Sequence, residues 1–339
     1  MQNLFSRYPM KTAVFYTKPY DREFLQKANQ GPHQLTFFES RLTPETVSIA
    51  KGFSAVCVFV NDQVDAVVLE ELAKQGCKIV ALRCAGYNNV DLKAAAALGI
   101  PVVRVPAYSP AGVAEHTVGL MLTLNRKFHR AYNRTRDGNF SLDGLLGFNM
   151  RGKTVGVIGT GKIGLEVVRL VTAFGCSVIA SDTHRNSEAE KLGLRYVELS
   201  ELFRVSDIIT LHCPLLPATH HLIDKGAIDQ MKKGVMLINT SRGPLVDARA
   251  VKNALKDGKI GYLGLDVYEE EEGIFYENLS GKIIEDDLLL RLISFHNVLI
   301  TSHQAFFTKE ALQAIAETTI QNLTEFEETG ACANEVKAS

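Results

Sequence analysis

Short apolar segments alternate with amphipathic segments along almost the whole chain. The first series has apolar runs at residues 12–17, 34–38, 55–59 and 78–82, separated by helical patterns at 21–29, from Pro44 onward and at 64–75. Apolar runs of this length that alternate with helices predict parallel strands joined by right-handed crossovers. We therefore expect the first hundred residues to form a doubly wound α/β unit.

A second series of the same kind begins at Lys153. Its apolar runs predict strands at 154–158, 177–180, 207–211, 235–239, 262–266 and 298–301. Runs such as Val-Gly-Val-Ile are apolar on both faces, which is typical of central strands in a parallel sheet covered by helices on both sides. A final helical pattern at about 309–328 follows, and we expect it to return to the first unit.

One long helical pattern, from Ala111 to about Thr135, links the two series. Apolar residues recur in it at three- and four-residue spacing, and basic residues cluster near its end. We expect one continuous helix of about 25 residues, a length that favours a subunit interface and hence a homodimer or a dimer-based tetramer. No aromatic interleaving or nucleic-acid motif accompanies the basic residues, so nucleic acid is not an expected partner.

Length and composition limit the possible functions. The 339 residues predict about two domains, and 37 basic against 38 acidic residues leave no broad field for binding nucleic acid. No segment approaches the ~18 uninterrupted apolar residues of a membrane span, and the first ten residues lack the apolar core of a signal peptide. The six cysteines form no CxxC motif and no metal-ligand spacing. We therefore expect a cytoplasmic protein with free thiols and without a metal site.

A glycine motif marks the start of the second series. The segment TVGVIGTGKIG places GxGxxG directly after a strand and at the beginning of a helix. Gly159 permits the tight turn, Gly161 lets the backbone approach a pyrophosphate, and Gly164 lets helix and strand pack closely. The helix N-terminus then offers free N–H groups to the phosphates. These features predict a dinucleotide site.

The residue that ends the next strand selects the cofactor. Asp182 lies 18 residues beyond Gly164, where a carboxylate can bind both ribose hydroxyls. The same carboxylate repels the 2′-phosphate of NADP, so we expect NAD. Because Arg185 lies three residues further on, NADP is not excluded entirely.

Three polar segments follow later strands of the second series. They contain Arg242, the acidic run 269–272, and His303. The planar fork of arginine suits a substrate carboxylate, and histidine can donate or accept a proton near neutrality. A glutamate beside the histidine would orient its ring, but the pattern does not choose among the four glutamates of the run.

Several motifs together resemble the NAD-dependent D-2-hydroxyacid dehydrogenases, and in particular the bacterial fermentative D-lactate dehydrogenases among them. They are RCAGYNNVD (83–91), VPAYSP (105–110), AEHT (114–117), HRAYNRTR (129–136), LHCP (211–214), NTSRG (239–243), LDVYE (265–269) and SHQAF (302–306). The resemblance implies a Rossmann NAD-binding domain, residues 104–301, inserted in a flavodoxin-like substrate domain formed by residues 1–103 and 302–339.

The resemblance also implies roles for individual residues. It identifies Glu271 as the partner of the acid/base His303, and Arg242 as the group that binds the pyruvate carboxylate. Backbone N–H groups at Gly86 and Tyr87 would also bind that carboxylate, and Tyr108 and Phe306 would shape a small methyl pocket. The implied cofactor contacts, besides the three glycines, are Lys162, Ile163, Asp182, Cys213, Pro214, Thr219, Thr240 and Asp266, the last of which would hold the nicotinamide amide.

The implied reaction is the reduction of pyruvate to D-lactate by NADH. Two other functions stay open: a dehydrogenase for another 2-keto acid (2-ketoisocaproate, glyoxylate or hydroxypyruvate), and an NAD-sensing protein related to corepressors of this fold. A zinc site at His212, beside Cys213, His220 and His221, is not expected, because neither HExxH nor paired Cys/His spacing is present. For His212 we expect a structural or cofactor-lining role.

Overall fold

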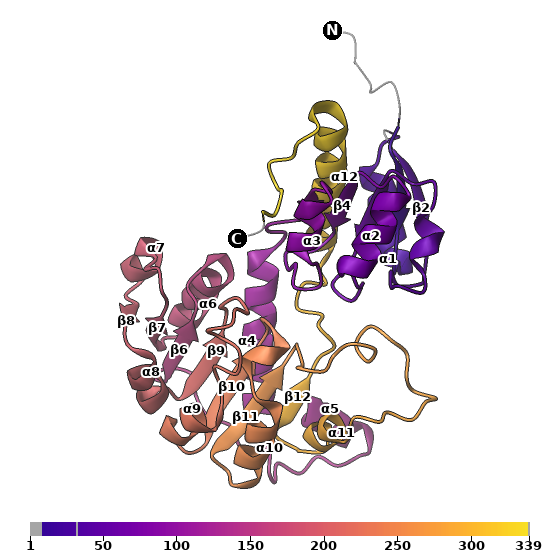
Figure 1. The fold of residues 1–339 in the computed structure, drawn as a ribbon. Helices are drawn as coiled ribbons and strands as arrows, with labels where there is room; N and C mark the ends of the chain where they lie inside the picture. The colour runs from indigo at the N-terminus through magenta and orange to yellow at the C-terminus, as the bar shows by residue number, and fades with distance from the viewer. Residues whose placement is uncertain (1–8, 32, 338–339) are drawn as a thin grey trace. The chain divides into compact units, whose positions relative to one another are not determined.

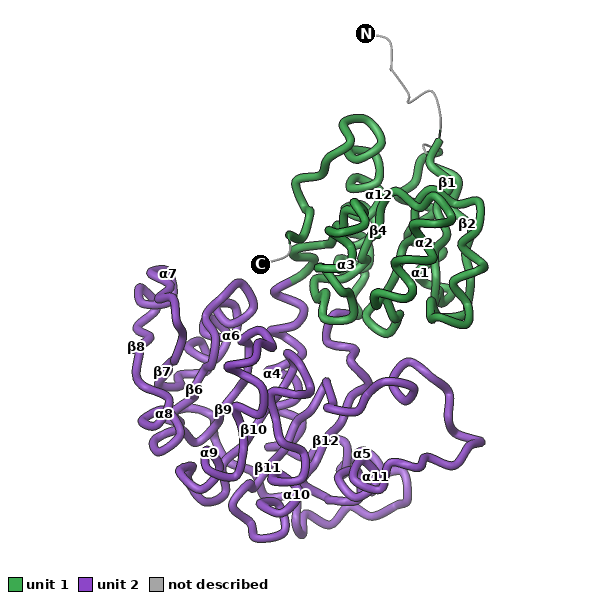
Figure 2. Tube along the Cα trace, in the orientation of Figure 1, with its two compact units in different colours: residues 1–109, 307–339 green, residues 110–306 purple. Residues whose placement is uncertain are grey.

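The computed structural model describes residues 9–31 and 33–337, in which the chain folds as two units. Unit 1 comprises the described residues of 1–109 and 307–339, and unit 2 is residues 110–306 (Figure 2). Each unit contains one sheet in which the neighbouring strands are parallel (Figure 1). The expectation of two doubly wound α/β domains is confirmed.

The sheet of unit 1 has the strand order β2-β1-β3-β4-β5, which is the flavodoxin-like arrangement. Its strands are β1 (Lys11–Val14), β2 (Gln34–Phe37), β3 (Ala55–Val58), β4 (Ile79–Leu82) and β5 (Val102–Val103). Its helices are α1 (Pro19–Ala28), α2 (Ala66–Lys74), α3 (Leu92–Ala97) and α12 (Lys309–Thr329). Strands β3 and β4 are buried at every position, which explains why their sequences are apolar without alternation.

The last helix completes the core of unit 1. Ala316 and Ile320 of α12 lie in one buried cluster with Val14 and Cys57 of the sheet and Leu25 of α1. Unit 1 is therefore built from both ends of the chain (Figure 2).

The sheet of unit 2 has the order β12-β11-β10-β9-β6-β7-β8. In chain order, β6, β7 and β8 extend the sheet in one direction, and β9 to β12 extend it in the other. The topological switch point therefore lies between β6 and β9, and parallel sheets bind their ligands at such a point. The strands are β6 (Thr154–Ile158), β7 (Ser177–Ser181), β8 (Arg195–Tyr196), β9 (Ile208–Leu211), β10 (Val235–Asn239), β11 (Ile260–Leu265) and β12 (Val298–Ile300).

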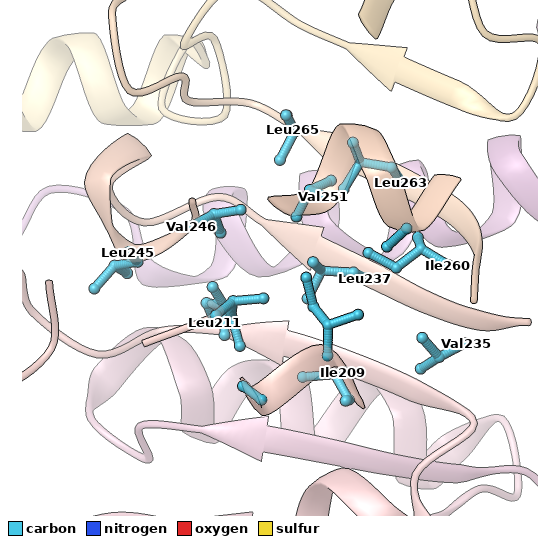
Figure 3. Close-up of a cluster of buried hydrophobic side chains, with 14 of the residues drawn as sticks. Ile209, Leu211, Val235, Leu237, Leu245, Val246, Val251, Ile260, Leu263 and Leu265 are labelled. Atoms are coloured by element: carbon cyan, nitrogen blue, oxygen red, sulfur yellow. The ribbon is translucent and has the colours of Figure 1, made fainter. Parts of the chain in front are cut away.

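Helices cover both faces of this sheet. They are α4 (Pro110–Arg126), α6 (Lys162–Ala173), α7 (Ser187–Lys191), α8 (Leu199–Val205), α9 (Lys225–Gln230), α10 (Ala248–Lys256) and α11 (Asp287–Ile293). A further helix, α5 (Phe128–Arg136), has no buried residue. Alternate residues of β10 face opposite layers: Val235 and Leu237 join the cluster under α9, α10 and α11 (Figure 3), whereas Met236 and Ile238 join the cluster under α4 and α6. No helix in residues 9–31 or 33–337 is long and apolar enough to cross a bilayer.

The expectation of one continuous helix at 111–135 is wrong. Helix α4 ends at Arg126, Lys127 adopts a left-handed conformation with φ +54°, and α5 begins at Phe128. The Lys127 ammonium donates to the carbonyl of Leu146, and the Asn125 side chain is hydrogen-bonded to both backbone groups of Phe148. Contacts with a segment about twenty residues further on therefore stabilise the break.

The helix expected from Pro44 is also wrong. Only a short 3₁₀ turn forms there, at Val47–Ala50. The Thr46 hydroxyl accepts from the Thr43 N–H and donates to the carbonyl of Arg41, so side-chain bonds replace the helical pattern. Two strands of two residues each, β5 and β8, and the six-residue helix α3 were too short to stand out in the sequence pattern.

Candidate active site

The glycine motif forms a tight turn between β6 and α6. Gly159 has φ +93°, and a Cβ atom there would lie 2.6 Å from the backbone nitrogen of Cys213. A Cβ atom on Gly164 would lie 2.0 Å from the carbonyl oxygen of Gly159, so helix and turn pack as the sequence predicts. Gly161 differs, because no atom lies within 4 Å of its ideal Cβ position. The space above Gly161 is open at the start of α6, where Lys162 and Ile163 form the first turn.

Asp182 lies at the end of β7, beside this turn. Its carboxylate accepts hydrogen bonds from the Thr160 N–H (2.5 Å), the Thr160 hydroxyl (2.9 Å) and the His184 N–H (3.0 Å). Burial opposes ionisation, but these hydrogen bonds outweigh it and hold the pKa of Asp182 below its usual range. The residue is therefore a fixed anion beside the turn that binds pyrophosphate in such folds. An open helix N-terminus next to a fixed carboxylate fits NAD.

The segment after β9 lies against the glycine turn at the switch point. Burial lowers the pKa of His212 to about 3, and its Nε2 atom lies 2.9 Å from the Thr210 hydroxyl, so this histidine is neutral. Cys213 has a thiol whose pKa burial raises to about 11, and its carbonyl accepts from the Ser241 hydroxyl. The Thr219 hydroxyl donates to the carbonyl of Pro214, which closes the following turn. The structural or cofactor-lining role expected for His212 stays a prediction.

Arg242 and Thr240 follow β10. The Thr240 hydroxyl is buried against the hydroxyl of Thr117 on α4, at 2.8 Å. Arg242 is half-buried, and its guanidinium donates to the carbonyl of Ser241. A Cβ atom on the next residue, Gly243, would lie 2.0 Å from the carbonyl oxygen of Tyr268. The arginine loop is thus in direct backbone contact with the loop that follows β11.

Asp266 follows β11 and is only 1% exposed. One of its carboxylate oxygens accepts from the Thr301 hydroxyl (2.5 Å) and the Gln304 N–H (2.9 Å), and the other from the Ala305 N–H (2.9 Å). Burial opposes its ionisation, but hydrogen bonds from His116 and Thr301 outweigh that effect and lower its pKa. Asp266 therefore holds the loop after β12 in place. Its expected contact with the nicotinamide amide stays a prediction.

His303, in this loop, is paired with Glu271. Its Nδ1 atom lies 2.7 Å from Glu271 Oε1, and Glu271 Oε2 accepts from the Tyr268 N–H at 3.0 Å. The backbone of His303 is left-handed, with φ +53°, and is held from both sides: its N–H donates to the carbonyl of Asp266 (2.7 Å), and its carbonyl accepts from the Tyr276 hydroxyl (3.0 Å). A strained, doubly anchored histidine is typical of a functional residue.

The remaining expected substrate-binding residues are distributed over both units. Gly86, Tyr87 and Tyr108 belong to unit 1, where the Arg104 guanidinium donates to the carbonyl of Ala85 and lies 5.0 Å above the Tyr87 ring. Phe306 is buried at the end of unit 2. The substrate contacts of all four residues stay predictions.

The sequence pattern does not predict three residues that hold the site together. Tyr268 and Tyr276 fix Glu271 and His303 through a backbone N–H and a hydroxyl, and neither contact has a signature in the sequence. His116, which lies 3.4 Å from Asp266 and 3.1 Å from the Thr301 hydroxyl, was visible only as part of the AEHT motif, without a role.

The edge of the sheet in unit 2 thus combines a dinucleotide turn, a half-buried arginine and a histidine–glutamate pair. Residues 118–305 match the family model of the "D-isomer specific 2-hydroxyacid dehydrogenase, NAD binding domain". The chain belongs to this family. This dehydrogenase therefore binds NAD through unit 2, in agreement with the open Gly161 position and the fixed Asp182 anion.

Comparison with individual proteins extends the likeness of this dehydrogenase over nearly the full chain. The D-lactate dehydrogenase of Escherichia coli K12 is 55% identical over 328 residues, which cover 96% of this chain and all of that protein. The apo-structure of D-lactate dehydrogenase from Escherichia coli superposes with a TM-score of 0.88 at 54% identity, covering 96% of this chain and 100% of that one. D-lactate dehydrogenase from Aquifex aeolicus, solved with NAD and lactic acid, has a TM-score of 0.86 at 33% identity, covering 97% and 99%.

Proposed function

We propose that this dehydrogenase reduces pyruvate to D-lactate with NADH as the cofactor. The observation that carries the proposal is the His303–Glu271 pair, 2.7 Å apart, at the edge of the sheet where Arg242 also emerges. High identity to D-lactate dehydrogenase from Escherichia coli supports pyruvate as the substrate. The arginine provides a fork for a carboxylate, and the histidine provides a proton for the carbonyl oxygen that a 2-keto acid carries beside it.

The residues of the chain handle charge and proton transfer. Arg242 binds the substrate carboxylate and polarises the neighbouring carbonyl group. When bound, NADH supplies the hydride that the keto carbon takes up. The His303 imidazolium gives its Nε2 proton to the carbonyl oxygen, which becomes the hydroxyl of D-lactate. Glu271 accepts the Nδ1–H throughout, so it keeps the ring oriented and balances the charge of the imidazolium. In the reverse direction, His303 removes the hydroxyl proton.

The test is NADH oxidation by the purified protein with pyruvate, 2-ketoisocaproate, glyoxylate and hydroxypyruvate side by side, with chiral analysis of the product. We expect the highest kcat/KM with pyruvate and D-lactate as the product. A higher kcat/KM with a bulkier or hydroxylated keto acid would overturn the substrate assignment. Tight NADH binding without turnover of any 2-keto acid would instead identify an NAD-sensing protein.

We further propose that the enzyme is a homodimer or a dimer-based tetramer. Support comes from α5 and the segment that follows it, where apolar side chains are exposed: Phe128, Tyr132, Phe140, Leu142 and Leu146, the last at 87%. A group of exposed apolar side chains in one segment favours an interface there. Light scattering should give at least twice the chain mass of 37.3 kDa, and L146D should shift it toward the monomer.

We place the enzyme in the cytoplasm, in fermentation. The six cysteines are all free thiols, which suits a reducing compartment. Reduction of pyruvate consumes NADH, as fermentation requires. Fractionation of cells grown without an external electron acceptor, followed by assay of D-lactate and enzyme, tests both statements.

A further inference from the structure

A second cluster of ionisable side chains shares no residue with the His303–Glu271 pair. It consists of His220 and His221, from the turn after β9, and Glu269, from the loop after β11. One donor atom of each residue lies within 4.8 Å of those of the other two. The imidazole rings are neighbours, with centroids 4.1 Å apart, and His221 Nε2 lies 2.5 Å from Glu269 Oε1.

The backbone holds two members of this cluster, which we call the His-His-Glu cluster, in fixed positions. His221 has φ +50°, and its N–H donates to the carbonyl of Pro244 at 2.8 Å. Two residues further along each segment, Ile223 and Val246 form an isolated parallel β-bridge. Glu269 directly follows Tyr268, whose carbonyl oxygen lies against Gly243. The turn of the histidines and the loop of the glutamate are thus both attached to the segment after β10.

The donor set has the chemistry of a transition-metal site. Two imidazole nitrogens and one carboxylate oxygen are ligands for zinc and related divalent ions, and three protein ligands leave a fourth position for water. Zn–N and Zn–O distances of about 2.0–2.2 Å place tetrahedral ligand atoms roughly 3.3 Å apart. The donor atoms lie no more than 4.8 Å apart, so the proposed site requires only small side-chain movements to bring them to that spacing. His220 is exposed and His221 and Glu269 are half-buried, so an ion has access from solvent.

We propose that His220, His221 and Glu269 form a binding site for one divalent transition-metal ion. The ion replaces the hydrogen bond between His221 and Glu269. It joins the turn after β9, which carries the expected cofactor contact Thr219, to the loop after β11, which carries Glu271. The site shares no residue with those assigned to the proposed reaction. Sequence spacing did not reveal it, because Glu269 lies 48 residues from His221.

The test is titration of the full chain with ZnCl₂ by calorimetry and with CoCl₂ by absorption, since tetrahedral Co²⁺ has intense visible bands. We expect one ion per chain and weakening of at least tenfold in H220A and in E269Q. The control is H296A, because His296 is another exposed histidine of unit 2. H220A removes an exposed ring, so a folded variant is expected, and circular dichroism checks this. The proposal is overturned if H220A binds Zn²⁺ as tightly as the unaltered chain, if H296A weakens binding equally, or if binding is not saturable.

Discussion

Glu271 accepts hydrogen bonds through both carboxylate oxygens, and one of its two partners is the catalytic candidate His303. The Oε1 atom lies 2.7 Å from His303 Nδ1, while Oε2 is held by the Tyr268 N–H. A carboxylate only accepts hydrogen bonds, so Nδ1 carries a proton, and Nε2 is the atom that would exchange one with substrate in the proposed reaction. The glutamate thus fixes which nitrogen of the ring is left for the proposed proton transfer.

Replacing His303 should abolish most of the turnover. H303N is the suitable variant, because asparagine tolerates the left-handed backbone at this position better than alanine does. We expect kcat to fall by about 10²–10⁴-fold, the usual contribution of an acid/base group. E271Q should reduce kcat less, since the imidazole remains. Steady-state assays and NADH fluorescence measure both, and unchanged turnover in H303N would remove His303 from the mechanism.

Arg242 should matter for pyruvate and little for NADH. In R242K the lysine keeps the positive charge of the arginine but lacks the planar fork that binds both carboxylate oxygens. Loss of one charge-assisted hydrogen bond, at about 1.5–3 kcal/mol, corresponds to a roughly 10–100-fold weaker interaction with pyruvate. KM for pyruvate and Kd for NADH, measured on the same preparation, separate the two effects. Equal weakening of both would contradict the assigned role.

Two glycines of one motif should respond differently to alanine. G161A adds a methyl group where no atom lies within 4 Å, so the fold should tolerate it while NADH affinity falls. G164A brings Cβ to 2.0 Å from the Gly159 carbonyl, so it should destabilise unit 2 by about 1–3 kcal/mol. Thermal unfolding with and without NADH distinguishes them. An unchanged NADH affinity in G161A would mean that the cofactor does not approach this backbone.

Asp266 should contribute stability that disappears in acid. Its pKa is depressed in the folded chain, so the folded state binds fewer protons than the unfolded state as pH falls below the ordinary aspartate pKa of about 3.9. D266N should lower the free energy of unfolding by about 2–3 kcal/mol at pH 7, because the Ala305 N–H loses its acceptor. The difference should stay constant down to about pH 4 and shrink below it. Urea titrations at pH 7, 5, 4 and 3 measure it, and a difference that grows in acid would contradict this account.

The sequence pattern predicts the fold well where burial determines residue choice. Strands β6 and β10 begin and end at the predicted residues, because their runs are apolar on both faces and bounded by polar or glycine residues. The same pattern fails at Lys127, where no glycine or proline announces a break. That break depends on hydrogen bonds with Leu146 and Phe148, and a local pattern contains no information about them.

The site residues, like the elements of the fold, are predicted only in part by the sequence pattern. Arg242 and His303 are predictable as residue types that follow strands, since all strands of a parallel sheet end at one edge. The choice of Glu271 within the run 269–272 came from the family resemblance alone. In the structure, Glu269 is paired with His221 and Glu271 with His303, so two nearby residues of one type have different partners. Loop conformation, which composition does not encode, separates them.

Because unit 1 is formed by two separate segments of the chain, it can complete its core only late in folding. Its sheet comes from the first part of the chain, but its core is incomplete until α12 supplies Ala316 and Ile320. Unit 2 is continuous in sequence and can fold while the ribosome is still adding the last residues. Until α12 is made, the part of the β1–β5 sheet that this helix covers therefore stays exposed, and α1 alone packs on that face. Pulsed hydrogen exchange during refolding should show amides of β1 protected only together with those of α12.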